Sequence, residues 1–470
     1  MKMKVKKVST MTKAPDLREN KMRTMPIGKL LLTMALPLVS SMLVQALYNV
    51  VDSIYVSRVS ESAVTALSLA FPVQNLQIGC ATGVAVGVNS LLSKSLGEGD
   101  REKANQTAGK GIFLMLLFVA VFMLFGIFGS HGYFAMQSEV EETVSGGTSY
   151  IAICSILCLG IFVEVLGERL LQASGKTVFT LFTQGTGAIV NILLDPVFIF
   201  GYFGIPAMGI AGAAVATVIG QWVAAVMAVI FNLKFNTDVK FGLHYLKPKK
   251  EVVKPILTVG IPSIVMMAIG SVMNFGMNQI LQGFKRYGET ATGVFGIYFK
   301  LQSFVFMPVF GVNNAIISIV AFNYGAREPK RITGTLKRSL GTILCVMGVG
   351  LLVFQLVPEL LLEIFNPSED FMTLGISALR VISLGFPMAG VGIALGASFQ
   401  AMGTGIYSTI TSLCRQMIVL LPVAYLLSLT GEVTAVWWSF PIAEVISMML
   451  SLFFYGRIYR QKIKPMFTKD

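Results

Sequence analysis

The sequence predicts an all-α integral membrane protein with twelve transmembrane helices, arranged as two parallel repeats of six. Composition indicates the class: 54% of the 470 residues are apolar and only 13% are charged, against about a quarter charged in soluble domains. The mean hydropathy is +0.73. The apolar residues form helix-length runs of about 20 residues or more, rather than short alternating strands. Charge distribution and an internal repeat support the number of helices.

Twelve apolar runs are each long enough to cross a bilayer as a helix. Several exceed the roughly 20 residues that crossing needs, so we expect tilt or projection beyond the bilayer. The predicted spans are residues 28–56, 64–93, 111–130, 148–171, 178–203, 208–233, 254–283, 290–322, 339–358, 374–401, 405–429 and 434–456.

The basic residues orient these spans. If the spans alternate, 31 of the 37 Lys and Arg residues fall on one side, three on the other and three inside spans. Cytoplasmic loops carry such an excess, so both termini are predicted to be cytoplasmic. The net charge of +13 is therefore explained by topology, and no nucleic-acid partner is expected.

The two halves of the chain repeat one another. Matching residues recur in the same order at offsets between 224 and 228, and a nearly constant offset indicates a duplicated unit. The matching pairs are Pro37 with Pro262, Asn89 with Asn313, Gly175 with Gly403, and Pro196 with Pro422. Because six spans is an even number, both units have the same topology and are related by an axis along the membrane normal.

The repeat defines the domain organisation. Two six-helix lobes around a central cavity are typical of transporters that alternate access by lobe movement. The predicted segments are a basic tail at 1–27, a first lobe at 28–233, a linker at 234–253, a second lobe at 254–456 and a tail at 457–470.

Ionisable groups inside spans are costly and therefore suggest function. Asp52 lies in the first span, where Gln45, Asn49 and Asp52 follow one stripe of a helix. In the fifth span Asn191 and Asp195 are one turn apart, and Pro196 should bend the helix there.

The sixth span adds Ala213 and Thr217, one turn apart, next to a small-residue run at 209–214 that permits close helix packing. Carboxylate, amide and hydroxyl oxygens suit a proton or Na⁺ rather than a soft metal. The alternative is that these groups only hold helices together, and Thr217 can be a packing hydroxyl bonded to its own helix. Glu164 and Glu168 are expected to form a local ion pair with Arg169.

The second half lacks these acids. At the matching offsets Asp52 falls against Met277 and Asp195 against Leu421. A purely structural role would predict acids in both halves, so the asymmetry favours an ion site in the first lobe. The second lobe would contribute an apolar wall that includes Met273 and Met277. Four charged residues there either line the cavity or pair with one another: Lys300, Arg380, Arg415 and Glu444.

Three stretches of the sequence are similar to a known family: Pro37, Gln45 and Asp52 of span 1, the motif from Asn191 to Pro196, and the run from Met208 to Thr217. Through them the chain resembles the multidrug and toxic compound extrusion (MATE) family over residues 25–460. The resemblance implies a V-shaped pair of bundles that exports cationic or amphipathic compounds in exchange for H⁺ or Na⁺. Its first-lobe cation site maps onto Asp52, Asn191, Asp195 and Thr217, with a backbone carbonyl from Ala213. Gln45 and Asn49 would face the substrate cavity. Some members also carry acids in spans 7 and 10, which this sequence lacks.

The sequence therefore predicts a cation-coupled multidrug efflux antiporter. We expect a monomer in a bacterial plasma membrane, with small-molecule drugs or toxic metabolites as cargo and no cofactor beyond the coupling ion. The alternative is a flippase for lipid-linked precursors, which shares the two-lobe architecture. A membrane enzyme is disfavoured, because no spans carry a His cluster or metal-spaced Cys. The sequence does not choose between H⁺ and Na⁺, name the substrates, or indicate which face is open.

Overall fold

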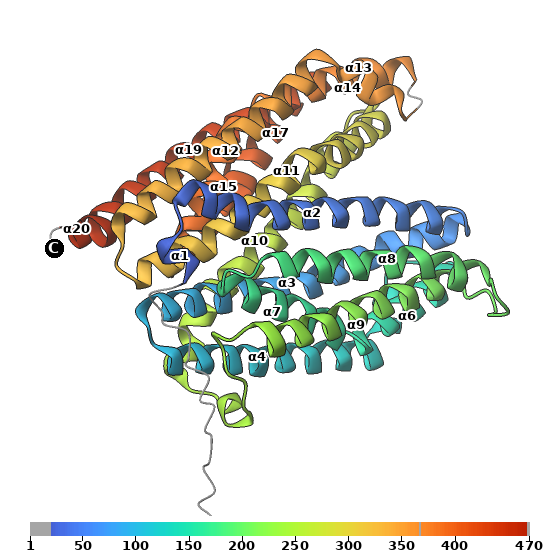
Figure 1. The fold of residues 1–470 in the computed structure, drawn as a ribbon. Helices are drawn as coiled ribbons and strands as arrows, with labels where there is room; N and C mark the ends of the chain where they lie inside the picture. The colour runs from blue at the N-terminus through green and yellow to red at the C-terminus, as the bar shows by residue number, and fades with distance from the viewer. Residues whose placement is uncertain (1–19, 366–367, 468–470) are drawn as a thin grey trace, which may run out of the picture.

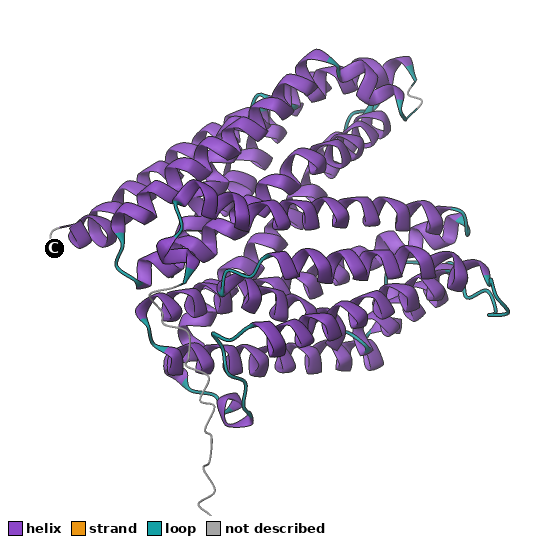
Figure 2. Ribbon diagram, in the orientation of Figure 1, coloured by secondary structure: helices purple, strands orange, loops and turns teal. Residues whose placement is uncertain are grey.

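The computed structural model describes residues 20–365 and 368–467, and all regular structure within them is helical (Figure 2). The helices of the first half are α1 (Lys21–Thr24), α2 (Ile27–Ser57), α3 (Glu61–Glu98), α4 (Arg101–Phe128), α5 (Ser130–Ala135), α6 (Glu141–Ile156), α7 (Leu159–Ala173), α8 (Val178–Phe200) and α9 (Ile210–Phe235).

A 3₁₀ turn, η2 (Leu243–Leu246), lies in the predicted linker. The helices of the second half are α10 (Lys250–Gln282), α11 (Gly288–Gly325), α12 (Pro329–Leu356), α13 (Pro358–Glu363), α14 (Glu369–Ser383), α15 (Phe386–Ala401), α16 (Gly405–Leu413), the π-helix η3 (Cys414–Leu420), α17 (Leu421–Ser428), α18 (Val433–Val436), α19 (Ser439–Ile458), the π-helix η4 (Tyr459–Ile463) and α20 (Lys464–Phe467).

Ten of the described helical segments are long and apolar enough to cross a membrane, and two bent pairs raise the number to as many as twelve. The bent pairs are α6 with α7 and α14 with α15, each with a 47° angle at a short break. They occupy the same place in the two halves. The predicted set of twelve spans is confirmed, but spans four and ten are broken helices rather than continuous ones.

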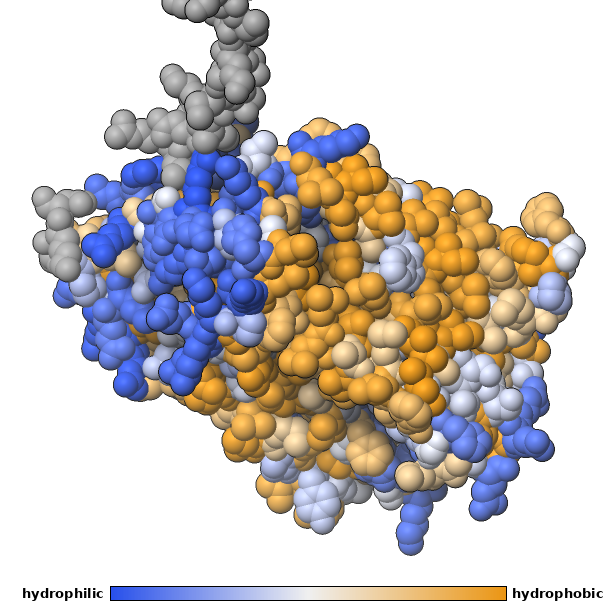
Figure 3. Space-filling view, turned by 90° about the horizontal axis from the view of Figure 1, so that it is seen from below, coloured by the Kyte–Doolittle hydropathy of each residue, from blue (hydrophilic) through white to orange (hydrophobic). Residues whose placement is uncertain are grey.

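The surface has the distribution that a bilayer requires. Figure 3 shows a broad apolar band between a strongly polar end and a second, smaller polar end. Large apolar side chains are exposed on both lobes, among them Phe128 on α4 and Phe453 on α19, which are 80% and 65% exposed. Exposed apolar area on this scale is stable in lipid but not in water.

The helices form two lobes that meet at one end and diverge toward the other (Figure 1). Within the first lobe α8 packs on α9 and α7 packs on α9, and within the second α12 and α19 pack on α15. Between the lobes α3 contacts α10 and α11, while α2 contacts α11 as well as its own neighbour α8. The predicted two-lobe architecture is confirmed.

The lobes touch closely at the end where α1 and α20 lie (Figure 1). Gly87 of α3 is so near α10 that an added Cβ would lie 2.2 Å from the Ile256 carbonyl oxygen, so only glycine permits this contact. The Ser318 hydroxyl of α11 donates to the buried Asn89 side chain of α3 at 3.1 Å. This end holds the loops predicted to be cytoplasmic, so the V opens toward the opposite side.

The end of the predicted basic tail is part of this closed contact. Met22 of α1 is fully buried. Asn323 and Arg331 of the second lobe donate to its carbonyl at 3.3 and 2.8 Å, while a Cβ added to Gly175 of the first lobe would lie 3.1 Å from the Met22 side chain. The short helix α1 therefore lies between the lobes.

Candidate functional site

Three helices of the first lobe bring the predicted polar residues together. Asn191 and Asp195 lie on α8, Thr217 and Ala213 on α9, and Asp52 on α2. The helices α8 and α9 approach closely, because a Cβ added to Gly220 would lie only 2.7 Å from the Gly187 carbonyl oxygen and 3.2 Å from the Asn191 side chain. Within the predicted small-residue run, a Cβ added to Gly212 would lie 2.4 Å from the Phe198 carbonyl oxygen, so small residues allow α9 to pack closely against α8.

Asn191 is the centre of the hydrogen bonding in this cluster. Its Nδ2 donates to Asp195 Oδ1 at 3.3 Å and to Thr217 Oγ1 at 3.4 Å. The i, i+4 spacing on α8 accounts for the first contact, and the α8–α9 packing accounts for the second. Asp195 is 0% exposed and Asn191 3%, so both polar groups lie inside the protein.

Three oxygens of this cluster are buried without a hydrogen-bond partner: Asp52 Oδ1, Asn191 Oδ1 and Asp195 Oδ2. Leaving one buried acceptor unsatisfied costs about 1–3 kcal/mol. No described Lys or Arg forms an ion pair with either acid, and Asp195 interacts electrostatically with Asp52. The cluster is therefore short of positive charge and of donors.

A proton or a small hard cation would supply what the cluster lacks. Within the described ranges no three His, Cys, Asp or Glu side chains gather as a metal group. Two carboxylates combined with an amide oxygen and a hydroxyl instead form an all-oxygen donor set, which suits Na⁺ and does not suit a soft metal. The Thr217 hydroxyl belongs to this set because it accepts a hydrogen bond from Asn191 on the neighbouring helix, and not from a group of its own helix.

Groups that the sequence analysis missed adjoin the cluster. Tyr48 of α2 lies near both Asp52 and Asp195, and Tyr150 of α6 lies near Asp52 and Tyr48. The Gln74 amide donates to the Tyr150 hydroxyl at 2.8 Å. Tyrosines are common in apolar runs, so spacing alone carried no signal for them.

Beside Tyr150 lies a small polar pocket of about 20 Å³, whose lining includes Gln74, Gln77 and Gln221. A volume of about 10–15 Å³ holds one water when polar partners surround it. The pocket is therefore large enough for a single water close to the acids.

One expectation for the first lobe needs correction. Glu168 and Arg169 attract one another but form no direct ion pair; Glu168 accepts hydrogen bonds from Thr183 at 2.6 Å and Gln184 at 3.0 Å, and Arg169 donates to Gln172. Pro196 lies inside α8, which is continuous from Val178 to Phe200, and the bend expected at this proline stays a prediction.

The predicted substrate-cavity residues divide into three cases. Gln45 is half-buried on α2, and the side chain of Asn49 lies outside the described residues. Met273 and Met277 are 7% and 0% exposed in the core of the second lobe, so in this conformation they pack against other side chains. The exposed methionine of α10 is Met267, which faces Gly79 of α3.

The charged residues left open in the second lobe are largely paired. Arg415 of η3 donates to Glu444 of α19 at 2.8 Å, and this pair is mostly buried. Arg380 pairs with Glu359 at 3.3 Å near the surface, and Lys300 is exposed. Arg415 and Arg380 are therefore neutralised within the second lobe, whereas the acids of the first-lobe cluster have no cation partner.

The match to a known protein family also divides the chain into two halves. A sequence model of the MatE family matches the chain twice, over residues 37–197 and 262–426. The two matches begin at Pro37 and Pro262, the proline pair that the internal repeat indicated. Together they cover well over half of the chain.

Individual relatives are distant but extend over nearly the full length. The multidrug export protein MepA of Staphylococcus haemolyticus is 23% identical over 428 residues, covering 91% of this chain and 93% of the relative. An outward-facing multidrug resistance MATE family transporter superposes with a TM-score of 0.87 at 24% identity, covering 96% and 98% of the two chains. A MOP superfamily transporter from Pyrococcus furiosus, described as having a binding pocket of reverse polarity, gives a TM-score of 0.86 at 24% identity over 95% and 98%.

Proposed function

The chain belongs to the MatE family, and from this membership we propose that it is a secondary active efflux transporter. It exports cationic or amphipathic small molecules in exchange for H⁺ or Na⁺, and the coupling ion binds at Asp52, Asn191, Asp195 and Thr217. The names of its relatives, which include multidrug export proteins, support the cargo class. The protein works in a bacterial plasma membrane as a monomer and catalyses no covalent reaction.

The observation that carries this proposal is the set of buried oxygens without partners. Asp52 Oδ1, Asn191 Oδ1 and Asp195 Oδ2 come from two helices and lack donors in one small region. A bound proton satisfies one carboxylate oxygen, and a bound Na⁺ satisfies several oxygens at once. Binding of the ion therefore stabilises this site, and release of the ion destabilises it. Coupling requires such a difference in free energy between the two states of the site.

The helix α2 links this site to the second lobe. It carries Asp52 beside α8, and it also packs against α11, where Gly311 lies against the backbone of Val39. Loading or releasing the ion changes how Asp52 is held, and α2 transmits the change to the contact between the lobes. Movement of the lobes then exposes the cargo to the other side of the membrane.

The alternative function, transport of lipid-linked precursors, has less support. A pyrophosphate cargo needs unpaired cations in the cavity. Of the three candidate cations, Arg415 and Arg380 are engaged with Glu444 and Glu359, which leaves Lys300. The charges without partners in the first-lobe cluster are the acids Asp52 and Asp195, and these favour cationic cargo.

The test is transport by the reconstituted protein. Proteoliposomes containing the native chain should accumulate or expel a cationic dye when a pH gradient or a Na⁺ gradient is imposed, and the effective gradient identifies the ion. Asp52→Asn should abolish the gradient dependence, with Glu363→Gln, an exposed residue at the end of α13, as control. Dye movement that ignores both gradients, or movement of fluorescent lipids alone, would overturn the proposal.

A further inference from the structure

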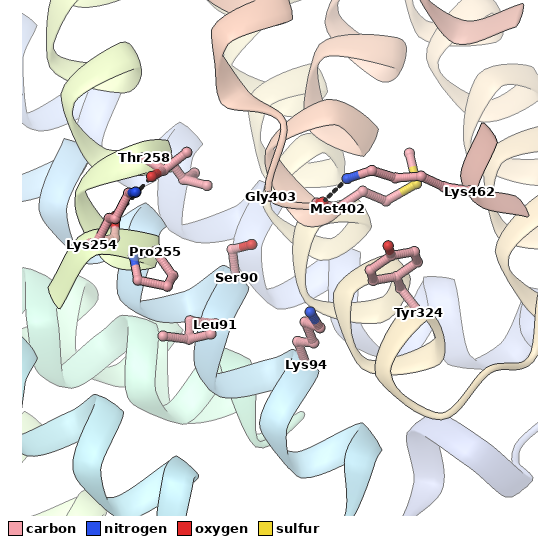
Figure 4. A pocket seen from close by; sticks show the side chains of 11 residues that line it. Ser90, Leu91, Lys94, Lys254, Pro255, Thr258, Tyr324, Met402, Gly403 and Lys462 are labelled. Atoms are coloured by element: carbon pink, nitrogen blue, oxygen red, sulfur yellow. Dashed lines mark hydrogen bonds between the residues drawn. The ribbon is translucent and has the colours of Figure 1, made fainter. Parts of the chain in front are cut away.

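A pocket of about 320 Å³ lies between the lobes at their closed end, away from the acidic cluster. Figure 4 shows Ser90 and Lys94 of α3 between Lys254 and Thr258 of α10 on one side, and Tyr324 and Lys462 on the other. Ser90 and Lys94 belong to the first lobe, and the other four belong to the second. The pocket is therefore built by both halves of the molecule.

The lining of this pocket is strongly basic. It includes three lysines and no carboxylate. Lys94 lies 3.6 Å from Glu98, but Glu98 is shared with Lys103 at 3.0 Å. Neither Lys254 nor Lys462 forms an ion pair with any carboxylate that the structure describes. The like charges of Lys94 and Lys462 repel one another here, and Lys254 adds a third positive charge to the lining, so an anion would be stabilised in this cavity.

The neutral groups of the pocket hold two of the lysines in place. The Lys462 amine donates to the Met402 carbonyl at 3.1 Å. Lys94 and Lys462 lie 5.4 and 5.8 Å from the centroid of the Tyr324 ring, within the range of cation–π attraction. Ser90, Thr258 and Tyr324 also line the space, but the Ser90 and Thr258 hydroxyls already donate to the Gln400 and Lys254 carbonyls. The ammonium groups are therefore the donors that match the oxygens of a phosphoryl group.

We propose that this inter-lobe pocket binds a phosphoryl anion, either a free phosphate compound or the headgroup of an anionic lipid, held by Lys94, Lys254 and Lys462. The volume accommodates a phosphate ion or a headgroup. Because Lys94 comes from the first lobe and the other two lysines from the second, the anion bridges the lobes and stabilises their contact at this end. A ligand that binds one arrangement of the lobes shifts the population toward it.

Binding itself does not depend on the proposed transport function. The consequence for lobe movement rests on that function, because only a transporter must separate the lobes at this end. The experiment therefore measures binding, with no gradient and no drug present.

The experiment uses the purified full-length protein in neutral detergent. Inorganic phosphate and a short-chain phosphatidylglycerol are titrated separately at constant ionic strength, with chloride as the reference, and the midpoint of thermal unfolding is followed. Ligand-bound protein should unfold at a higher temperature with saturation. Hydrogen exchange should slow in residues 254–259 and 402–404, which places the ligand in the pocket.

Lys254→Gln and Lys462→Gln should each weaken the apparent affinity about tenfold, the effect of losing one charge-assisted hydrogen bond. Lys250→Gln is the matched control, because Lys250 is an exposed lysine of the same helix outside the pocket lining. Lys254 is itself exposed, so its replacement leaves the packing of the lobes intact.

Each of the two titrations has an outcome that supports or overturns the proposal. Saturable binding of phosphate that depends on the lysines supports it with a free anion as ligand, and the same result with the lipid alone supports it with a headgroup. Absence of binding in both titrations overturns it. So does an affinity that is unchanged in Lys254→Gln, or a response to both phosphate and the lipid that is no greater than the response to chloride.

Discussion

The two lobes use the same stretch of the repeated unit in different ways. In the first lobe the residues before Pro196 belong to one continuous α-helix, α8. In the second, the seven residues of η3 before α17 and Pro422 form a π-helix. A proline lacks the N–H that would bond the carbonyl of the preceding turn. Only in the second lobe does the backbone before the proline form the wider turns of a π-helix. Wide turns of this kind are common at functional positions.

The side chains differ as much as the backbones. Asp195 and Asn191 are buried in the first lobe with oxygens that have no donor. Near the matching place in the second lobe, Arg415 and Glu444 form a neutral pair at 2.8 Å. One lobe therefore needs an external positive charge, and the other carries its own. At these matching positions the first lobe leaves its acids without a cation and the second lobe pairs its charges, and the proposed coupling site rests on this difference.

The largest expected effect on stability comes from breaking the second-lobe pair. Arg415→Met leaves the Glu444 carboxylate largely buried without a cation, which should lower the free energy of unfolding by about 1–3 kcal/mol after allowance for partial exposure. Removing both charges, with Arg415→Met and Glu444→Met together, should restore most of that loss. Denaturant unfolding in detergent measures both variants. If the double variant is as unstable as the single one, the two residues do not act as a neutral unit.

A smaller effect is expected from the first-lobe hydroxyl. Thr217→Val removes the oxygen that accepts from Asn191, so the ion concentration for half-maximal transport should rise about three- to fivefold, corresponding to about 1 kcal/mol. Thr217→Ser keeps the oxygen and should remain near native. Equal behaviour of the Val and Ser variants would remove Thr217 from the site.

The smallest expected effect concerns the two prolines. Pro422→Ala supplies an N–H that can bond the Ile418 carbonyl, so the π-helix should shorten toward an α-helix and hydrogen exchange at 418–422 should slow severalfold. Pro196→Ala should change exchange in α8 less, because that helix is already continuous. A larger change in α8 than in η3 would contradict the assigned difference between the lobes.

Spacing along a helix predicted the parts of the site that share a helix. Asn191 and Asp195 are one turn apart and do form a hydrogen bond, and the small residues of α9 do allow close packing. Spacing does not predict which helices become neighbours or how each is rotated. The contacts of Glu168 with Thr183, of Arg415 with Glu444 and of Gln74 with Tyr150 all join different helices. Spacing therefore predicted the wrong partner for Glu168, left the partner of Arg415 undecided, and did not indicate the contact of Gln74 with Tyr150.

The same limit applies to helix geometry and burial. Hydropathy located spans four and ten, but a break of two residues between apolar helices hardly changes their hydropathy. The 47° bends were therefore not predicted. A methionine such as Met277 is equally suited to an apolar cavity wall and to a packed core, so its residue type does not distinguish the two locations. Only the packing of α10 shows that its side chain is fully buried here.

The most direct test of the account compares neutralisation of the two lobes in one transport assay. Proteoliposomes with Asp195→Asn are compared with those carrying Arg415→Gln and Glu444→Gln together, at equal protein incorporation, for dye transport driven by the effective gradient. We expect Asp195→Asn to lose gradient-driven transport by at least about tenfold, since the ion site loses a carboxylate, and the double variant to retain most of it. Retained coupling in Asp195→Asn, or its loss only in the double variant, would contradict the placement of the coupling ion in the first lobe.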